Sequence, residues 1–288
     1  MATKTPQKST AESTFSLISN SKLQQMYSTM LQYRILESHA RKIIGGKASM
    51  RGREAMLVGS AIDLQDEDAL AIANDAGIAS FLKKAPLSSI LGQLQKRKAG
   101  RGKTKAKQRR VALASASDAA HGSIATGIAL ANSRAASSNV TLAVMQNTTD
   151  HAGTFAFARE HKLPIIYVIN GFDEAEAQSY GFPVIPVDGN DVVAVYRVAY
   201  ECILRARQGG GPSMLACIDF PLALSVVKSR DPLRNMERYL TGKGLFTENW
   251  KRQLIQSFER ELRQSLAAAK KAARGKQQSG RDDRVFSI

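Results

Sequence analysis

Two residues that can transfer protons, Asp150 and His151, stand side by side between an apolar run and a helical segment. An acid next to an imidazole can act as a general acid and base near neutral pH. The same pair is also explained by a helix cap beside a surface histidine, and this second interpretation is favoured. The other histidines show no metal-ligand spacing and predict packing or surface positions instead of a zinc site: His39, His121 and His161.

Composition is that of a globular protein without a membrane anchor. The 288 residues are 43% hydrophobic, which allows one large domain or two small ones. No apolar run approaches the roughly 20 residues that a membrane-spanning helix needs, and the first residues lack a secretory signal pattern. Cys202 and Cys217 lie in apolar stretches, so we expect buried thiols in a reducing compartment, the cytoplasm.

The net charge of +16 is concentrated in two segments. Residues 96–110 carry nine Lys or Arg and no acid, and residues 251–288 carry ten against four Asp or Glu, so together they supply fifteen of the sixteen charges. One interpretation of 96–110 is a solvated loop kept open by like-charge repulsion. Another is a salt-dependent contact with nucleic acid or another polyanion, although no aromatic residue interleaves the run to stack on bases.

Short apolar runs alternate with helical segments through the middle of the chain. The runs are rich in Val and Ile and are bounded by polar residues, Gly or Pro, which is typical of buried strands. They are Ala69–Ala73, Val111–Ala114, Val140–Met145, Ile165–Ile169, Val184–Val187 and Met214–Ile218. The alternation predicts an α/β fold, a mostly parallel sheet covered by helices on both faces. Ligands of such sheets bind beyond the carboxyl ends of the strands, here after Ala73, Met145 and Ile169.

The two ends of the chain differ from this middle part. Residues 1–21 are rich in Ser and Thr and predict a disordered tail. Apolar residues at helical spacing begin at Leu23 and predict a helix to Lys42, before Gly45-Gly46. Residues 22–246 would then form the main domain, with the basic loop 96–110 inside it.

Two further helices follow from capping residues and spacing. One spans about Val192 to Arg207, with Asn190 or Asp191 as its cap. The other starts near Thr247 and opens a C-terminal segment, 247–288, that ends in a basic tail. This helix has an apolar stripe that predicts either a docking arm or, as is more usual, packing on its own domain: Trp250, Leu254, Phe258, Leu262 and Leu266.

Three stretches carry a family resemblance, and together they span most of residues 22–270. The first stretch, Gly52-Arg53-Glu54-Ala55, is similar to the pattern GQEA. The second, Val187-Asp188-Gly189-Asn190-Asp191, resembles VDGND and is followed later by Gly-Pro. The third begins at Asp231-Pro232 and is similar to DP…R.YL…G. In this order they resemble the alpha subunit of thiamine-diphosphate-dependent 2-oxo acid dehydrogenases of the pyruvate and branched-chain type. The resemblance implies a thiamine-diphosphate-binding fold.

The same resemblance implies a cofactor, a metal and a partner. Alpha subunits of this family hold thiamine diphosphate through its diphosphate and a Mg²⁺ ion, decarboxylate a 2-oxo acid and pass the acyl group to lipoamide. A beta subunit completes the site in a heterotetramer. Such a site needs a carboxylate for the metal, small residues for close backbone approach and cationic donors for the diphosphate.

Several positions that would hold this cofactor are changed here. The family's GDGATNEGAF aligns with residues 146–155, which keep only Gly153 and Phe155 and place Asn147 where the metal-binding Asp would stand. Asn170 matches one Asn of ENN.Y. The family's YRDHG aligns with 73–77, which contain no Arg, and its His-containing YR.HGHS with 219–224, which contain no His. Asn147, Gly153 and Asn170 remain as residual cofactor-binding residues, and Asn147 and Asn170 as residual Mg²⁺ ligands.

Three hypotheses follow. The first is a structural or regulatory alpha-type subunit that pairs with a beta subunit or with itself and has weakened or lost thiamine diphosphate binding. The second is an active dehydrogenase alpha subunit with an altered site, in which Arg101 and Lys103 of the basic loop act as a replacement anion clamp. The third is a protein that binds nucleic acid or another polyanion through its basic segments. No residue is assigned as catalytic.

Overall fold

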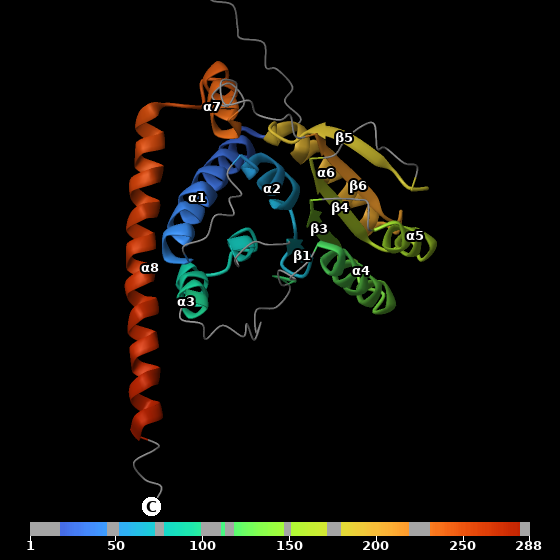
Figure 1. Ribbon diagram of the computed structural model, residues 1–288. Helices are drawn as coiled ribbons and strands as arrows, with labels where there is room; N and C mark the ends of the chain where they lie inside the picture. Colours follow the sequence, from blue (N-terminus) through green and yellow to red (C-terminus); the bar gives the residue numbers. More distant parts are fainter. Residues whose placement is uncertain are drawn as a thin grey trace, which may run out of the picture.

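Six parallel strands form one sheet in the middle of the chain (Figure 1). The computed structural model describes residues 18–44, 52–72, 78–98, 111–112, 118–146, 151–171, 180–218 and 231–282. The strands lie in the order β2-β1-β3-β4-β6-β5. Their bounds are β1 Ala69–Ile72, β2 Val111–Ala112, β3 Thr141–Met145, β4 Ile165–Asn170, β5 Val184–Asp188 and β6 Ser213–Ile218.

Each apolar run predicted as a strand overlaps one of these strands, although β4, β5 and β6 are each one residue longer than the predicted run. Every neighbouring pair is parallel. The α/β prediction is therefore confirmed. Helices connect the strands and follow the sheet, with a short 3-10 helix η1 at Ile78–Phe81. The helices are α1 Asn20–Ile44, α2 Glu54–Ala61, α3 Leu87–Lys98, α4 Asp118–Arg134, α5 Ala152–Glu160, α6 Val192–Arg207, α7 Pro232–Gly242 and α8 Glu248–Asp282.

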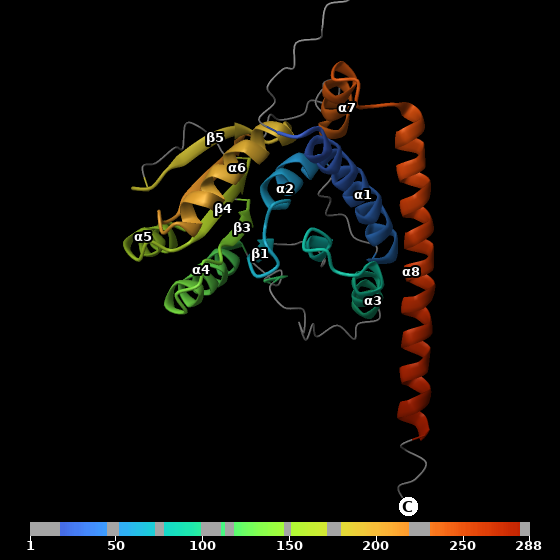
Figure 2. The ribbon, with the colours of Figure 1, turned by 180° about the vertical axis from the view of Figure 1, so that it is seen from behind.

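Alternate strand residues point to two different hydrophobic cores, as strand geometry requires. Leu142, Val144, Ile166 and Val168 belong to a core shared with α1, α2, α3, α6 and α8. Ala143, Met145, Tyr167 and Ile169 belong to a second core shared with α4 and α5. A third core joins α1, α2 and α7, with α8 packed against it. One face of the sheet is therefore covered by several helices and the other by two (Figure 1, Figure 2).

Capping residues explain where three helices begin. Asp191 is the cap of α6, because its Oδ1 accepts hydrogen bonds from the backbone N–H groups of Val193 and Ala194. Asp231 caps α7 in the same way through Leu233, with Pro232 in the first turn. Helix α1 begins at Asn20, earlier than the expected Leu23, because Ser19 Oγ accepts from the N–H of Lys22 and Ile18 is buried. Residues 18–21 of the predicted tail therefore belong to the folded chain, and residues 1–17 lie outside the described residues.

Helix α8 packs along α1 and α3 and extends beyond them (Figure 1, Figure 2). Of its apolar stripe, Phe258 and Leu262 are buried, and Trp250, Leu254 and Leu266 pack against the cores. The stripe therefore packs on the helix's own domain. None of the helices in the described part of the chain is both long enough and apolar enough to cross a membrane.

Candidate functional site

The sheet has a topological switch point between β1 and β3. The chain leaves β1 for β2 on one side, whereas it leaves β3 for β4 on the other side. In parallel sheets, ligands bind in the crevice that such a divergence opens beyond the carboxyl ends of the strands. The candidate site is therefore the carboxyl edge at β1, β3 and β4. The residues directly after β1 and β3, 73–77 and 147–150, lie outside the described residues.

Two amide side chains stand at this edge. Met145 is in register with Ile169, so Gln146 and Asn170, the next residues on each chain, lie beside one another. Asn170 is 8% exposed, and Gln146 is exposed. An amide oxygen is an acceptable Mg²⁺ ligand, but such ions prefer at least one carboxylate. Asn170 thus lies where the sequence placed it, and Asn147, its expected partner in metal binding, falls outside the described residues.

The first turns of α4 and α5 adjoin the same edge. A Cβ atom on Gly122 of α4 would lie 2.9 Å from Nδ1 of His151 and 2.9 Å from Cε of Met145. Helix α4 therefore packs so closely against the side chains of His151 and Met145 that a larger residue at 122 would require one of them to move. Ser123 and Thr154 also bring the two helices together, with 3.4 Å between their hydroxyl oxygens.

His151 is 2% exposed, so the favoured interpretation of a surface histidine is wrong. Its ring fills the space between Gly122, Met145 and the Phe155 ring, whose centroid lies 5.8 Å away. It occupies the cap position of α5 but makes no side-chain capping hydrogen bond, and Asp150 lies outside the described residues. His121 is buried as well, which agrees with packing. His39 is half-buried and His161 is exposed.

Gly153, the third residual cofactor residue, lies in the first turn of α5. It is exposed, and a Cβ atom added there would meet nothing within 4 Å. Packing therefore does not require glycine at this position. A helix N-terminus presents free backbone N–H groups and favours anions, so the first turn of α5 is suited to a phosphate that lies over it.

The described residues at this edge do not complete a metal site by themselves. No group of three or more His, Cys, Asp or Glu side chains that could hold a metal ion occurs among them. Asn170 is the described member of the predicted ligand pair. Arg101 and Lys103, the proposed anion clamp, also lie outside the described residues. The described part of the edge thus fits an anion at α5 better than it fits a magnesium ion.

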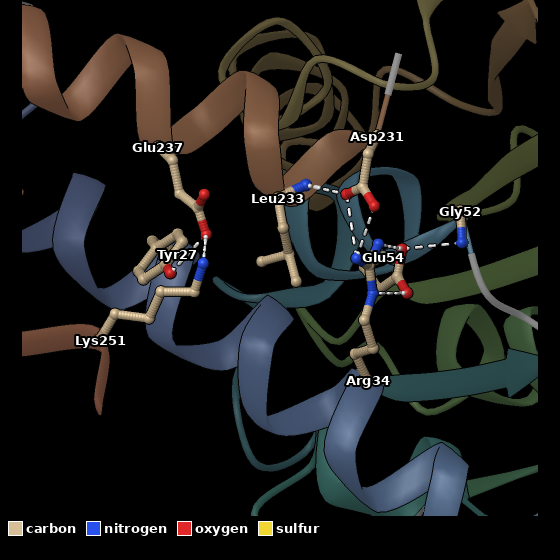
Figure 3. Close-up of polar contacts among 8 residues, drawn as sticks. All are labelled: Tyr27, Arg34, Gly52, Glu54, Asp231, Leu233, Glu237 and Lys251. Atoms are coloured by element: carbon tan, nitrogen blue, oxygen red, sulfur yellow. Dashed lines mark hydrogen bonds and ion pairs between the residues drawn. The ribbon is translucent and has the colours of Figure 1, made fainter. Parts of the chain in front are cut away.

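A buried ionic network on α1, α2 and α7 was not predicted from the sequence (Figure 3). Arg34 Nε lies 2.7 Å from Oε1 of Glu54 and its Nη2 lies 3.0 Å from Oε2, whereas Nη1 donates to both carboxylate oxygens of Asp231 at 3.0 and 2.8 Å. Glu54 is fully buried and also accepts a hydrogen bond from the N–H of Gly52. One guanidinium thereby joins α1 to the N-termini of α2 and α7.

A second contact of this kind fixes α1 to α7 and α8 (Figure 3). The Tyr27 hydroxyl donates to Oε1 of Glu237 at 2.9 Å, and Lys251 Nζ lies 2.8 Å from the same oxygen. Burial, reinforced by the Glu237 carboxylate, raises the pKa of Tyr27 above its ordinary value. Tyr27 is therefore a neutral donor at physiological pH, buried in an edge-to-face contact with Phe246.

The signal for the first network was visible in the sequence. Glu54 opens the stretch Glu54–Ala61, which is otherwise apolar or small, and a buried carboxylate must find a partner. Glu54 and Asp231 both belong to the stretches that carry the family resemblance. Their role is to hold the scaffold together.

A match that covers most of the chain identifies the family. The family model described as "Dehydrogenase E1 component" matches residues 22–172 and 173–224, well over half of the chain. The chain belongs to the dehydrogenase E1 component family. Within this family its relatives are alpha subunits, so the expected 2-oxo acid dehydrogenase alpha-subunit type is confirmed.

Two relatives cover most of the chain. The alpha subunit of acetoin:2,6-dichlorophenolindophenol oxidoreductase from Bacillus subtilis (strain 168) is 28% identical over 228 residues, 68% of each chain. The pyruvate dehydrogenase E1 component subunit alpha of Rhizobium meliloti (strain 1021) is 28% identical over 290 residues, 84% of this chain and 82% of the relative. A third, the acetoin oxidoreductase alpha subunit of Cupriavidus necator, is 35% identical over 111 residues, 32% of this chain and 33% of its own. E1 dehydrogenases ordinarily use thiamine diphosphate.

Proposed function

We propose that this E1 dehydrogenase chain is an alpha-type subunit that serves as a structural or regulatory partner and binds thiamine diphosphate weakly or not at all. Side chains within the family-like stretches hold the scaffold: Glu54 and Asp231 bind Arg34, and Asp191 caps α6. The positions that would hold the cofactor differ from the family pattern, with Asn147 in place of the metal carboxylate. This contrast between a kept scaffold and a changed site carries the proposal.

The loss of the carboxylate is the largest single change. Mg²⁺ is a hard cation that is held by carboxylates together with phosphate oxygens. Two neutral amides at 147 and 170 offer carbonyl dipoles but no negative charge to offset the ion. Weak binding is therefore expected even though the first turn of α5 remains available to an anion.

The rival function is an active alpha subunit with an altered site, which catalyses oxidative decarboxylation of a 2-oxo acid together with a beta subunit. The observation that favours it is the position of Asn170, which ends β4 at the carboxyl edge beside Gln146. Here Asn147, Asn170 and the first turn near Gly153 would hold thiamine diphosphate and Mg²⁺. In the third possibility, a polyanion would bind the basic side chains of α3 and α8, and the carboxyl edge of the sheet would take no part.

Calorimetric titration separates the first two functions. Titrating the full chain with thiamine diphosphate in excess Mg²⁺ is expected to give no binding in the micromolar range. Micromolar binding by the wild type that Asn170→Ala weakens tenfold or more would support the active-subunit function instead. Micromolar binding that Asn170→Ala leaves unchanged would contradict both, because it would place the ligand elsewhere. Thermal unfolding of both proteins shows whether the substitution left the fold intact.

Pairing with another subunit is the second part of the proposal. Ile124 of α4 is 48% exposed and Phe157 of α5 is 40% exposed, on two adjacent helices. Around them the exposed helix positions are mainly small: Ala120, Ser123, Gly127, Ala131, Ala152, Gly153 and Ala156. Large exposed apolar residues among small ones allow close packing against a partner. We infer that a beta-type subunit, or a second copy of this chain, covers this face in the cytoplasm.

A further inference from the structure

Helix α8 has two faces of different chemistry. Phe258, Leu262 and Ala269 are buried against the body of the protein. Arg252, Gln256, Arg260, Arg263, Ala267 and Lys271 are all exposed. Their spacing of three or four residues places these six on a single stripe, and a period of 3.6 residues puts that stripe on the side of the helix opposite the buried residues. Four cations therefore line the outer face.

Acidic residues do not neutralise this stripe. Glu261 lies at its flank, and Glu259 reaches Arg263 at 3.8 Å, while 70% of the Arg263 side chain stays exposed. A solvent-exposed ion pair of this kind contributes only about 0–1 kcal/mol and leaves the cation available to another anion. From Leu262 to Arg281 the helix sequence contains no acid.

Helix α3 also carries positive charge and packs against α8. A Cβ atom on Gly92 of α3 would lie 3.9 Å from Cβ of Ala269. One turn and a half beyond Gly92, Lys96 and Lys98 are exposed, and α3 contains no acid. Figures 1 and 2 show α8 running past the end of α3 in both views. Because Ala269 belongs to the buried side of α8, α3 lies on the side of α8 opposite the outer stripe, and its cations are separate from that stripe.

The types of side chain on the outer face of α8 indicate which class of partner this face can bind. Protein interfaces rely on large apolar or aromatic anchors, and membrane-surface helices need an apolar face to insert. The exposed positions of α8 from 252 to 271 carry Arg, Lys, Gln, Ser, Ala and one Glu, with no large apolar residue. Surfaces that bind nucleic acid are polar and strongly positive, and they gain affinity from phosphate neutralisation.

We propose that the outer face of α8 binds the phosphate backbone of double-stranded nucleic acid. We expect a contact with phosphate and not with base edges, because the Arg and Lys side chains of this face donate hydrogen bonds to phosphate oxygens. The stripe from Arg252 to Lys271 is about 28 Å long at 1.5 Å per residue, the length of roughly eight base pairs. This proposal is independent of the function of the carboxyl edge.

Fluorescence anisotropy with a labelled 20-base-pair DNA duplex tests the proposal on the full chain. The variant Arg260→Gln, Arg263→Gln, Lys271→Gln removes three charges from the outer face. The control Arg134→Gln, Arg197→Gln, Lys243→Gln removes three exposed charges from α4, α6 and the end of α7. At low salt the first variant is expected to bind at least tenfold more weakly than the control. Its slope of log K against log salt should be shallower by about 2–3, since each phosphate contact contributes about 0.9.

Three results would overturn the proposal. Equal losses in the two triple variants would mean that only net charge matters. Displacement of the duplex by poly-L-glutamate at equal charge concentration would identify an acidic protein as the partner. Tighter binding to vesicles of phosphatidylserine than to the duplex would identify a membrane surface. All substituted residues are exposed, so matching thermal unfolding curves establish that the variants fold.

Discussion

At the scale of single residues, Arg34 is the side chain on which the N-terminal part of the fold depends. Burial alone would lower the pKa of Arg34, but the hydrogen bonds that it donates to Glu54 and Asp231 outweigh burial and raise the pKa above the ordinary arginine value. Burial would likewise raise the pKa of Asp231, but Arg34 and the N–H groups of Leu233 and Arg234 lower it. The pair Arg34 and Asp231 is thus ionised at neutral pH.

Acid should weaken this network in a defined range of pH. Because the pKa of Asp231 is lower in the folded chain than in the unfolded one, its contribution to stability is present above the ordinary carboxyl value of about 4. That contribution is lost as the pH falls from there through the lowered pKa. Asp231→Asn is expected to destabilise the protein by about 1–3 kcal/mol at pH 7, through a lost charged hydrogen bond and a lost cap. The difference from wild type should shrink between about pH 5 and pH 3.

Urea unfolding at several pH values measures this effect. Asp66→Asn, which changes an exposed carboxylate in the turn after α2, is the control and should alter stability little. A stability difference for Asp231→Asn that stays constant from pH 7 to pH 3 would contradict the assignment.

The sequence could not predict which residues form this ionic network. Glu54 and Asp231 lie in family-like stretches, but the sequence did not show that they share a partner, because Arg34 is 197 residues from Asp231. No local pattern connects positions so far apart. His151 was misjudged for the same reason, because its burial depends on Gly122 of another helix.

At the scale of elements, the sequence predicted the buried strands and the helices α1, α6 and α8, but it gave no bounds for the other helices. The buried strands could be predicted because they are short runs rich in Val and Ile. The bounds of α6 could be predicted from its capping residue and from the Gly residues that follow it. Helix α2, in contrast, is buried on all sides and shows no helical period. Its eight residues resemble a buried strand in composition, so periodicity could not identify it.

The position of α8 depends on a few aromatic and aliphatic side chains. Phe258 is 2% exposed and its ring lies 5.8 Å from that of Phe81. Phe258→Ala should therefore cost about 3–5 kcal/mol of stability, by lost burial and the cavity that remains. Arg263→Ala, which changes an exposed residue on the opposite side of α8, should change stability by about 0.5 kcal/mol or less.

Denaturant unfolding of the two variants tests this difference. Comparable small effects in both would show that α8 is not packed against the first core. The measurement is independent of nucleic-acid binding, because Phe258 lies on the opposite side of the helix from the basic stripe.

At the scale of the whole molecule, the sheet is covered unequally. Five helices contribute to the core on one face, whereas α4 and α5 cover the other. The exposed Ile124 and Phe157 lie on the thinner side. This asymmetry was not predictable from the sequence, because the sequence shows that both faces are covered but not by how many helices. The concentration of charge on α8 was visible in the sequence, but its position on the outer face of the helix was not.

Assembly should depend on this thinner side. The double variant Ile124→Asp, Phe157→Asp is expected to prevent self-association or co-assembly with a co-expressed beta-type subunit, because it places charge in an interface core. Sedimentation velocity and co-purification measure both outcomes. Tyr200→Asp, at a 42% exposed aromatic residue of α6, is the control. Assembly that survives the double variant, or is lost equally in Tyr200→Asp, would contradict the assignment of the interface.

The contacts of α1 have a consequence for how the protein is made. Tyr27 and Arg34 bind residues that follow them by 210 and 197 positions. At about 5–20 residues per second, a ribosome needs roughly 10 to 40 seconds to reach those partners after it has made α1. During that interval the buried face of α1 lacks the α7 and α8 side chains that cover it in the folded chain. The contacts of α1 are therefore completed late, and the nascent chain must be kept from aggregating until α7 and α8 emerge.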